Sequence, residues 1–444
     1  RWGLPAAAAP GEDHHDKPRP ALGGPVPDPV RPEGGPAGPP PATAPQPGGR
    51  PAGERPEGPP GGGRPAVPAR VFPGAEGLFR LDPAVAHLNH GSFGAVPVPV
   101  QEAQAALRAL AHADPDAFFL GVCDRLAQAR ARIAAHLGAD PDGLAFIANA
   151  TEGANLALDA IPFAAGDEIL VTDHGYGTVV AAAARRATVT TVALDPLLPD
   201  EDAVRETVLA ALTPRTKAAL LDHVSSPTAR LIASPPLLAD LRERGVTTVV
   251  DGAHAPGMLA DPLAGGADFW FGNLHKWGYA PSGSAVLAVA PEHRHRVRAL
   301  VPSWEDQHGF PRSVEYRATA DYTGWLAAPE GLDLLQRLDA ARVRAHNSAL
   351  AAHGAALLAE IPGITPLPHG EGLAMRALLL PAGTAETPED AVALREEIAA
   401  RLRVRVLVWP RPGGGGIRIC GQVYNRPEEY ERLAAGLPAH LGRA

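Results

Sequence analysis

The chain has 444 residues, a formal net charge of −9 and 45% hydrophobic residues. The negative charge argues against a nucleic-acid-binding surface, which needs an excess of Lys and Arg, and no apolar run reaches the roughly 18 residues of a membrane-spanning helix. Cys123 and Cys420 are the only cysteines; they form neither a disulfide framework nor zinc-type spacing. We therefore expect a cytoplasmic protein that binds neither nucleic acid nor membranes.

The first part of the chain differs in composition from the rest. Residues 1–70 are mostly Pro, Gly, Ala and charged residues, as in GGPAGPPPATAPQPGGRPAGERPEGPPGGGRP. Such a segment buries too little apolar surface to offset the entropy lost on ordering. We therefore expect a disordered tail over 1–70, without the apolar core of a signal peptide.

The globular pattern begins at Val71. Residues 71–98 form a turn-rich segment that ends in LNHGSFGAVP (88–97), and we expect this segment to contribute to the active site. Helical patterns follow over 99–112 and 124–137. LAFIANATEGANLALDAI (144–161) then predicts a strand, a polar turn and a helix that opens near Glu152.

Short apolar runs alternate with helical segments after this point. They are EILVTD (168–173), TVTTVALD (188–195), AALLDHVSS (218–226), TTVVDGAH (247–254), ADFWFGN (267–273) and SAVLAVA (284–290). Continuous apolar strands separated by helices indicate a mainly parallel sheet that is covered on both faces. With the strand near residue 144, the pattern predicts an α/β large domain over 99–330 with a seven-stranded sheet.

A second pattern begins near Gly331 and predicts a smaller α+β domain over 331–444. It consists of a long helix over 331–358, a helix over 388–401, the strands VRVLVW (404–409) and IRICGQV (417–423), and a final helix over 427–437. The two domains together suit one large two-lobed enzyme.

Lysine is rare in this chain, because only Lys17, Lys217 and Lys276 occur among its 40 basic residues. Lys276 lies in GNLHKWGYAPSG (272–283), between a histidine and a tryptophan. A solvated surface lysine is the simplest interpretation. Arginine, however, cannot lose its proton near neutral pH, whereas a desolvated lysine can, and its free amine attacks carbonyl groups.

Polar residues follow several of the predicted strands. They are Asp251, Asn273, Ser225, Ser226 and Thr151, with His275 and Lys276 beside them. Ligands collect at the carboxyl ends of parallel strands, so we expect these side chains to converge. Each alone is commonly a strand-end residue that satisfies local backbone groups, but together they fit a Schiff base to pyridoxal phosphate. That chemistry needs a lysine, an acid for the ring nitrogen and a helix N-terminus for the phosphate.

Five motifs then carry a resemblance to a known family: LNHGSFGA (88–95), NATEGANLAL (149–158), DHVSSPT (222–228), VDGAHAPG (250–257) and GNLHKW (272–277). Together they resemble the class V aminotransferases, which are fold type I pyridoxal-phosphate enzymes. LNHGSFGA and NLHKW look most like the isopenicillin N epimerase group. The resemblance extends from about Val71 to Pro438 and implies the transferase fold type I, an amino-acid substrate and a homodimer.

The resemblance also implies roles for individual residues. Lys276 would form the Schiff base and move the substrate α-proton, Asp251 would pair with the pyridine nitrogen, and His254 would contact the phenolic oxygen. His174, or Tyr176, would stack on the ring. The other cofactor-binding residues implied are Thr151, the amides of Glu152 and Gly153, Ser226, Asn273 and His275.

Further implied roles concern the substrate and the partner subunit. Arg418, in GGGGIRICGQVYN, matches the arginine that binds the substrate α-carboxylate, and Asn89 and His90 are expected to bind substrate. Thr319 matches the position that reaches a phosphate across the dimer interface. Ala318 stands where the family usually has glycine, and Ser282 stands where the epimerase group often has lysine.

Four reactions stay open: epimerisation, β-elimination, transamination and cysteine desulfuration. Desulfurases that resemble this family carry a nucleophilic cysteine on a loop before the arginine, and residues 403–416 contain none. Cys420 lies on the same predicted strand as Arg418, where a small buried residue is expected. Desulfuration is therefore disfavoured. A ligand-binding regulatory module is also disfavoured, because the tail contains no basic DNA-binding helix.

The remaining reactions differ in the proton-transfer groups that they need. Epimerisation needs an acid or base on each face of the substrate carbanion; Lys276 serves one face, and His90, His174, Tyr176 and Tyr279 are candidates for the other. β-Elimination needs only Lys276 and a good leaving group. We predict an epimerase-like enzyme that acts at the α-carbon of an amino acid or amino-acid-derived metabolite. The alternatives are a C–S lyase, similar to cysteine desulfhydrases or sulfoxide lyases, and an aminotransferase.

Overall fold

The computed structural model describes residues 72–441, and the tail expected at 1–70 lies outside them. The predicted apolar runs form a seven-stranded sheet in the order β2-β8-β7-β6-β5-β3-β4. The strands are β2 (Leu144–Ile147), β3 (Glu168–Thr172), β4 (Thr188–Val192), β5 (Thr216–Asp222), β6 (Thr247–Asp251), β7 (Phe269–Asn273) and β8 (Ala285–Val289). The mainly parallel sheet is confirmed: only β8 runs antiparallel to its neighbours, β2 and β7.

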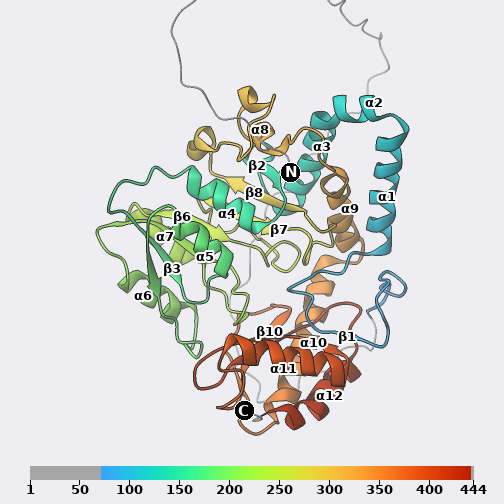
Figure 1. Ribbon diagram of the computed structural model, residues 1–444, viewed down its shortest axis with the longest axis vertical. Helices are drawn as coiled ribbons and strands as arrows, with labels where there is room; N and C mark the ends of the chain where they lie inside the picture. Colours follow the sequence, from blue (N-terminus) through green and yellow to red (C-terminus); the bar gives the residue numbers. More distant parts are fainter. Residues whose placement is uncertain (1–71, 442–444) are drawn as a thin grey trace, which may run out of the picture. The chain divides into compact units, whose positions relative to one another are not determined.

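Helices of the large domain cover both faces of this sheet (Figure 1). Side chains of α3, α6, α7 and α9 pack on one face, and those of α4 and α5 pack on the other. The large-domain helices are α1 (Val98–Ala113), α2 (Pro115–Leu120), α3 (Val122–Leu137), α4 (Ala150–Asp159), α5 (Gly177–Ala184), α6 (Glu201–Ala210), α7 (Pro235–Glu243), α8 (Arg312–Glu315) and α9 (Thr323–Arg337).

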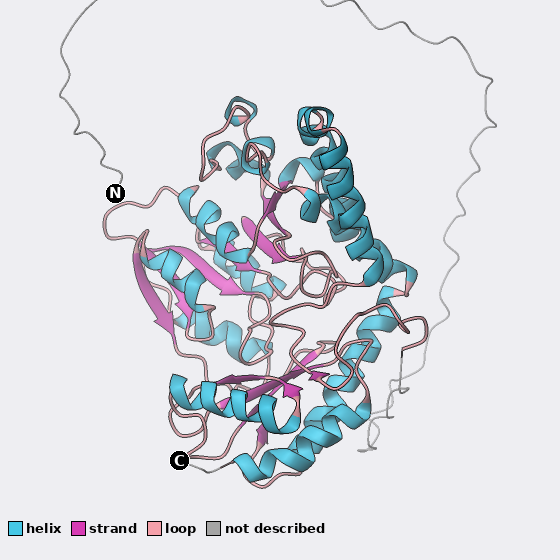
Figure 2. Cartoon of the chain, turned by 45° about the vertical axis from the view of Figure 1, so that its right-hand side comes forward, coloured by secondary structure: helices cyan, strands magenta, loops and turns pink. Residues whose placement is uncertain are grey.

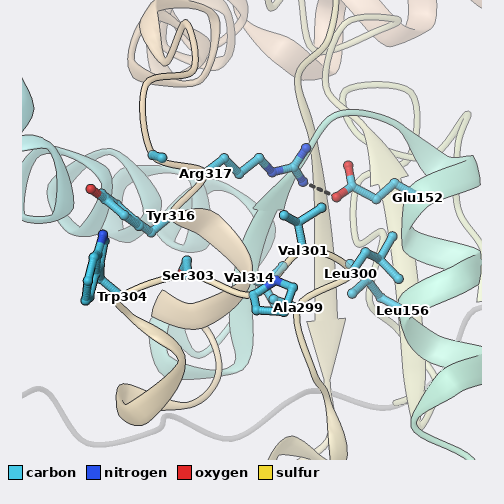
Figure 3. Close-up of a pocket in the computed structure, with 12 residues that line it drawn as sticks. Glu152, Leu156, Ala299, Leu300, Val301, Ser303, Trp304, Val314, Tyr316 and Arg317 are labelled. Carbon is cyan, nitrogen blue, oxygen red and sulfur yellow. Dashed lines mark hydrogen bonds and ion pairs between the residues drawn. The ribbon is translucent and has the colours of Figure 1, made fainter. Parts of the chain in front are cut away.

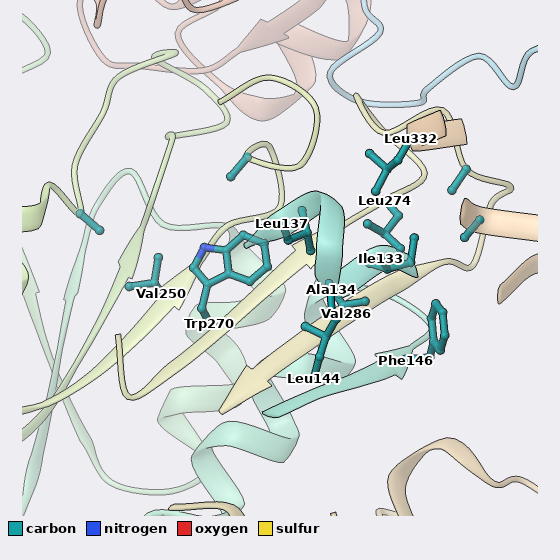
Figure 4. Close-up of a cluster of buried hydrophobic side chains, with 14 of the residues drawn as sticks. Ile133, Ala134, Leu137, Leu144, Phe146, Val250, Trp270, Leu274, Val286 and Leu332 are labelled. Atoms are coloured by element: carbon teal, nitrogen blue, oxygen red, sulfur yellow. The ribbon is translucent and has the colours of Figure 1, made fainter. Parts of the chain in front are cut away.

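The alternation of side chains along β7 shows why the apolar runs are continuous. Trp270 packs with Val250, Val286 and the helix α3 on one face (Figure 4), whereas Phe271 packs on the opposite face. Successive residues of a strand point to opposite faces, so a strand covered on both sides needs an apolar residue at every position. Each fully buried aromatic side chain contributes about 1.5–3 kcal/mol to the stability of the domain.

A smaller domain contains a four-stranded antiparallel sheet in the order β12-β13-β10-β9. Its strands are β9 (Thr365–Pro366), β10 (Met375–Leu379), β12 (Leu407–Trp409) and β13 (Gly416–Cys420), and its helices are α10 (Ala340–Ala359), α11 (Pro388–Leu402) and α12 (Pro427–Gly436). The three helices lie beside the small sheet (Figure 2). Among the described helices, none combines the length and hydropathy that crossing a bilayer would require.

Two predicted elements were wrong in detail. The long helix over 331–358 is two helices, because Asp339 has a left-handed φ of 64° and its side chain accepts a hydrogen bond from the amide of Arg342. The strand VRVLVW divides between two sheets. β11 (Val404–Arg405) pairs in parallel with β1 (Ala86–His87), whereas β12 pairs with β13. The N-terminal segment is thereby tied to the small domain.

Candidate active site

A cavity of about 470 Å³ opens beyond the carboxyl ends of β5, β6 and β7. The structure brings most of the predicted site residues to its walls. These are Asn89, Thr151, Tyr176, Ser226, Asp251, His254, Asn273, His275 and Lys276. Strand ends, the N-terminus of α4 and segment 89–93 therefore meet at one place.

The surroundings of Lys276 shift its amine toward the neutral form. Desolvation lowers its pKa to about 8, while the charge of Asp251 opposes this shift. Its Nζ lies 3.3 Å from Nε2 of His254. The indole of Trp277 donates to Nδ1 of that histidine over 3.4 Å, so in a neutral imidazole Nε2 carries the hydrogen. Once the amine loses its proton, Nε2–H can donate to its lone pair.

Asp251 has an acidic neighbour that the sequence analysis did not single out. Asp222 is its register partner on β5, both side chains are buried, and both line the cavity. Burial raises the pKa of both, and the charge of Asp251 raises the pKa of Asp222 further. Two buried carboxylates on adjacent strands do not both ionise. We therefore describe Asp222 as the protonated member and Asp251 as the carboxylate that faces Lys276.

Only some of the residues predicted to bind the phosphate at the N-terminus of α4 line the cavity. Asn273 accepts the amide of Ala150 over 2.9 Å, and the side chain of Thr151 forms a 3.0 Å hydrogen bond with that of Thr178. The amides of Glu152 and Gly153 donate instead to the side chain and carbonyl of Asn149, over 3.1 and 3.2 Å. Neither residue lines the cavity.

Glu152 faces a different hollow. Its carboxylate forms an ion pair with Arg317 (Figure 3), on the wall of an apolar groove of about 770 Å³. Gly153 has a packing role, because a Cβ there would lie 2.5 Å from Cβ of Phe271 in β7. A glycine at this position lets α4 approach the sheet closely.

The two aromatic candidates for ring stacking lie in different places. His174, the preferred one, is buried and hydrogen-bonded to the carbonyl of Leu194 over 3.1 Å and to the hydroxyl of Thr228 over 3.2 Å. Tyr176 is 52% exposed and lines the cavity. The structure therefore favours Tyr176 for contact with a ligand in the cavity.

Arg418 is a fully buried cation. Its guanidinium donates to the carbonyl and hydroxyl of Ser226 over 2.7 and 3.1 Å, and to Asn89 and Ser92 over 2.9 Å each. Within the described chain no carboxylate pairs with it, and its Nε has no hydrogen-bond partner. A buried charge without a counter-ion is costly, so a ligand carboxylate would supply the missing partner.

His90 and Tyr279 hold the polypeptide around the lysine instead of facing the cavity. His90 donates from Nε2 to the carbonyl of Lys276 over 3.1 Å and bonds through Nδ1 to Tyr424 over 2.9 Å. Burial lowers the pKa of His90 to about 4. Tyr279 donates to Gln422 over 2.7 Å, and burial raises the pKa of its phenol. Neither residue lines the Lys276 cavity.

The last three residues to place are His275, Thr319 and Cys420. His275 lines it but has Nδ1 bound to the carbonyl of Ser284 over 3.1 Å. Thr319 is exposed and lies next to Ala318, whose φ of 51° is the left-handed conformation that favours glycine. Cys420 is buried, accepts a hydrogen bond from the amide of Gly91, and has its pKa raised by burial.

Several residues at the site were missed by sequence reasoning. Ser92 holds Arg418, and Tyr424 and Gln422 hold His90 and Tyr279. Asp222 was visible at the end of an apolar run, next to the residues that were selected. The others come from the N-terminal segment and the small domain, where no strand-end pattern marks them.

Three comparisons with known proteins agree on the family and the fold of this chain. The family model described as aminotransferase class V matches residues 102–397. The chain is 35% identical to isopenicillin N epimerase from Streptomyces clavuligerus, over 83% of this chain and 98% of that protein. It is 31% identical to putative L-cysteine desulfhydrase 2 from Oryza sativa subsp. japonica, over 79% and 84%. A cystine C–S lyase, C-DES, solved with cysteine persulfide, shares the fold with a TM-score of 0.69 at 21% identity, covering 82% of this chain and 98% of that chain.

Proposed function

Because the chain belongs to the class V aminotransferase family and is a pyridoxal-phosphate enzyme, we propose that it epimerises the α-carbon of an amino acid or amino-acid-derived metabolite. One observation carries the proposal: a single cavity unites the Lys276 amine with the Asp251 carboxylate. Arg418, the buried cation without an acidic partner in the described chain, adjoins it through Asn89 and Ser226. Its relatives called isopenicillin N epimerase support this reading.

The residues at the cavity fit pyridoxal phosphate. Lys276 supplies an amine with a lowered pKa, Asp251 supplies a buried carboxylate for the ring nitrogen, and the first turn of α4 with Thr151 and Asn273 suits a phosphate. When bound, the cofactor supplies the electron sink that stabilises negative charge at the substrate α-carbon.

The chain's own residues then orient the substrate and move its α-proton. Arg418 binds the α-carboxylate with two nitrogens, which orients the amino acid. The amine of Lys276 accepts the α-proton on one face, which requires its neutral form. His254 donates to that amine and keeps it in place between proton transfers.

Inversion also needs a proton donor on the second face. Of the four candidates from the sequence, only Tyr176 lines the cavity with Lys276, and we assign this role to its hydroxyl. Tyr176→Phe should retain exchange of the α-proton and lose inversion. Equal inversion by the variant would refute the role of Tyr176.

A C–S lyase is the second candidate. The relatives called L-cysteine desulfhydrase favour it, and β-elimination needs only Lys276 as base. Incubation with L-amino acids and sulfur-containing conjugates in D₂O separates the two activities. Deuterium at the α-carbon with inversion supports the epimerase, whereas release of pyruvate supports the lyase.

The same experiment with Lys276→Ala tests the proposed chemistry as a whole. The wild-type enzyme loaded with cofactor should absorb near the edge of the visible range, and the variant should lose that band and both activities. A wild-type enzyme that neither absorbs there nor exchanges the α-proton of any amino acid would refute the proposal.

We also propose a homodimer in which Thr319 reaches the partner's phosphate site. Its support is the apolar groove beside Ala318, where Leu300, Val301 and Trp304 are 48%, 72% and 83% exposed. These side chains lie along the groove in Figure 3. An exposed apolar patch of this kind marks a protein–protein contact, and its continuity with Thr319 favours a second copy of this chain as the occupant.

A further inference from the structure

A separate cavity of about 270 Å³ lies behind the large sheet, as seen from the Lys276 cavity. His223 and Val250 line it, and their chain neighbours Asp222 and Asp251 line the Lys276 cavity. Successive residues of a strand point to opposite faces, so the sheet separates the two spaces. Within residues 72–441, no residue lines both cavities. A molecule behind the sheet would therefore leave the substrate site free.

The wall of this rear cavity is mostly apolar and carries no net charge. Glycines, alanines and aliphatic side chains line it, together with the indole of Trp270, which lies beside Val250 (Figure 4). Its only charged side chains are Asp140 and Arg294, which form an ion pair of 2.6 Å with each other. A charged ligand would lose its hydration here without gaining a free counter-ion, so the wall favours an uncharged ligand.

His223 supplies a hydrogen-bond donor to this apolar space. Its side chain is only 5% exposed, and burial lowers its pKa to about 4, so the imidazole is neutral at neutral pH. The indole of Trp270 donates to Nδ1 over 3.5 Å, which leaves the hydrogen on Nε2. This is the only hydrogen bond of the imidazole within the described chain. A buried donor without an acceptor is costly.

We propose that the rear cavity binds a small uncharged molecule through one oxygen atom that accepts a hydrogen bond from Nε2 of His223. Pockets for drug-sized ligands measure about 300–1,000 Å³, so a cavity of about 270 Å³ suits a molecule built on a single ring. The apolar wall covers the ring, and His223 fixes its orientation. This inference does not depend on the proposed function, because the two cavities share no residue.

Two ring compounds of similar shape test the proposal. Methyl benzoate carries a carbonyl oxygen, and ethylbenzene carries no oxygen. Calorimetric titration of the cofactor-loaded wild type should show one site for methyl benzoate. His223→Leu should weaken binding of methyl benzoate about fivefold, the usual effect of one neutral hydrogen bond, without weakening that of ethylbenzene. His223→Gln retains an N–H donor and should restore most of the affinity for the ester.

A second variant tests the location without changing the buried histidine. Ala264 lines the cavity from the partly exposed loop between β6 and β7, so Ala264→Phe should fill the space and abolish binding of both probes. Ala260→Phe is the matched control, since Ala260 is exposed on the same loop and lines neither cavity. Thermal unfolding of each variant verifies that it is folded.

The outcomes separate this site from water and from the substrate site. No binding of either probe to the wild type would mean that water alone fills the cavity, and would overturn the proposal. Equal affinities of wild type and His223→Leu for the ester, or binding that survives Ala264→Phe, would do the same. Excess L-alanine should leave the affinity for methyl benzoate unchanged, whereas competition between the two would place the ester in the Lys276 cavity and refute a separate site.

Discussion

The protonation state of Lys276 sets a pH dependence that can be measured before any turnover. Desolvation lowers its pKa to about 8, and only the neutral amine attacks an aldehyde. Capture of pyridoxal phosphate by the apoenzyme should therefore accelerate up to about pH 8 and level off above it. Stopped-flow absorbance measures this profile, and a midpoint at the ordinary lysine value would contradict the assignment.

A substitution at Asp251 tests the electrostatic cause of this shift. The charge of Asp251 raises the pKa of Lys276, so Asp251→Asn should move the midpoint of the capture profile to lower pH. Asp116→Asn removes an exposed acid on α2 and should leave the midpoint in place. An upward shift in Asp251→Asn would show that another group controls the amine.

Arg418 should act on the substrate carboxylate and not on the amine. In Arg418→Gln, the affinity for L-alanine should fall about tenfold or more, because charge-assisted hydrogen bonds are lost. The affinity for ethylamine, which has no carboxylate, should be unchanged. Titrations followed through cofactor absorbance give both values and show that the variant is folded. Equal losses for the two ligands would assign Arg418 a structural role only.

At the scale of elements, segment 88–97 is pressed against the turn that carries the lysine. A Cβ at Gly94 would lie 2.1 Å from the carbonyl oxygen of His275 and 2.7 Å from that of Lys276. Gly94→Ala should therefore destabilise the protein by about 1–3 kcal/mol and weaken cofactor binding by displacing Lys276. At Gly370 the nearest atom would be 3.5 Å away, so Gly370→Ala serves as the control. Thermal unfolding and cofactor titration measure both effects, and unchanged values for Gly94→Ala would contradict the close packing.

The elements that sequence reasoning predicted share one physical property. Strands such as β6 and β7 are buried on both faces, so burial dictates every side chain and the apolar runs mark them clearly. The antiparallel direction of β8 depends on its pairing with β2 and β7, and no pattern in its own residues indicates it. The divided strand over 404–409 depends on pairing with residues far away in the chain. The break at Asp339 had a local signal, since Asp is a common helix N-cap, but the continuous Ala-rich pattern around it masked that signal.

The site residues also divide into those that the sequence predicts and those that depend on long-range structure. Asp251, Asn273 and Lys276 follow strands, and the common edge of a parallel sheet brings them together. Tyr176 and His174 lie two residues apart on one loop, and only the course of that loop decides which lines the cavity. Arg395 is one exposed helical arginine among several, and its place at the Lys276 cavity depends on how β1 pairs with β11. Long-range pairing of this kind cannot be read from one sequence.

At the scale of the whole molecule, the apolar groove predicts a dimer that sedimentation can detect. With cofactor bound, the wild type should sediment as a dimer. The double variant Val301→Glu, Trp304→Glu places buried charges in the proposed contact. Because unpaired buried charges are costly, this variant should be monomeric. Because Thr319 is proposed to contact the partner's phosphate site, these monomers should also bind the cofactor about tenfold more weakly.

The control for this prediction carries the same change elsewhere. Leu197→Glu replaces an apolar residue that is 46% exposed beyond β4 and distant in sequence from the groove, and it should leave the dimer and the cofactor affinity intact. A wild-type enzyme that is monomeric while fully loaded with cofactor would contradict both the interface and the role of Thr319. Dissociation without a loss of cofactor affinity would retain the interface and remove Thr319 from the phosphate site, since the two parts of the proposal rest on separate residues.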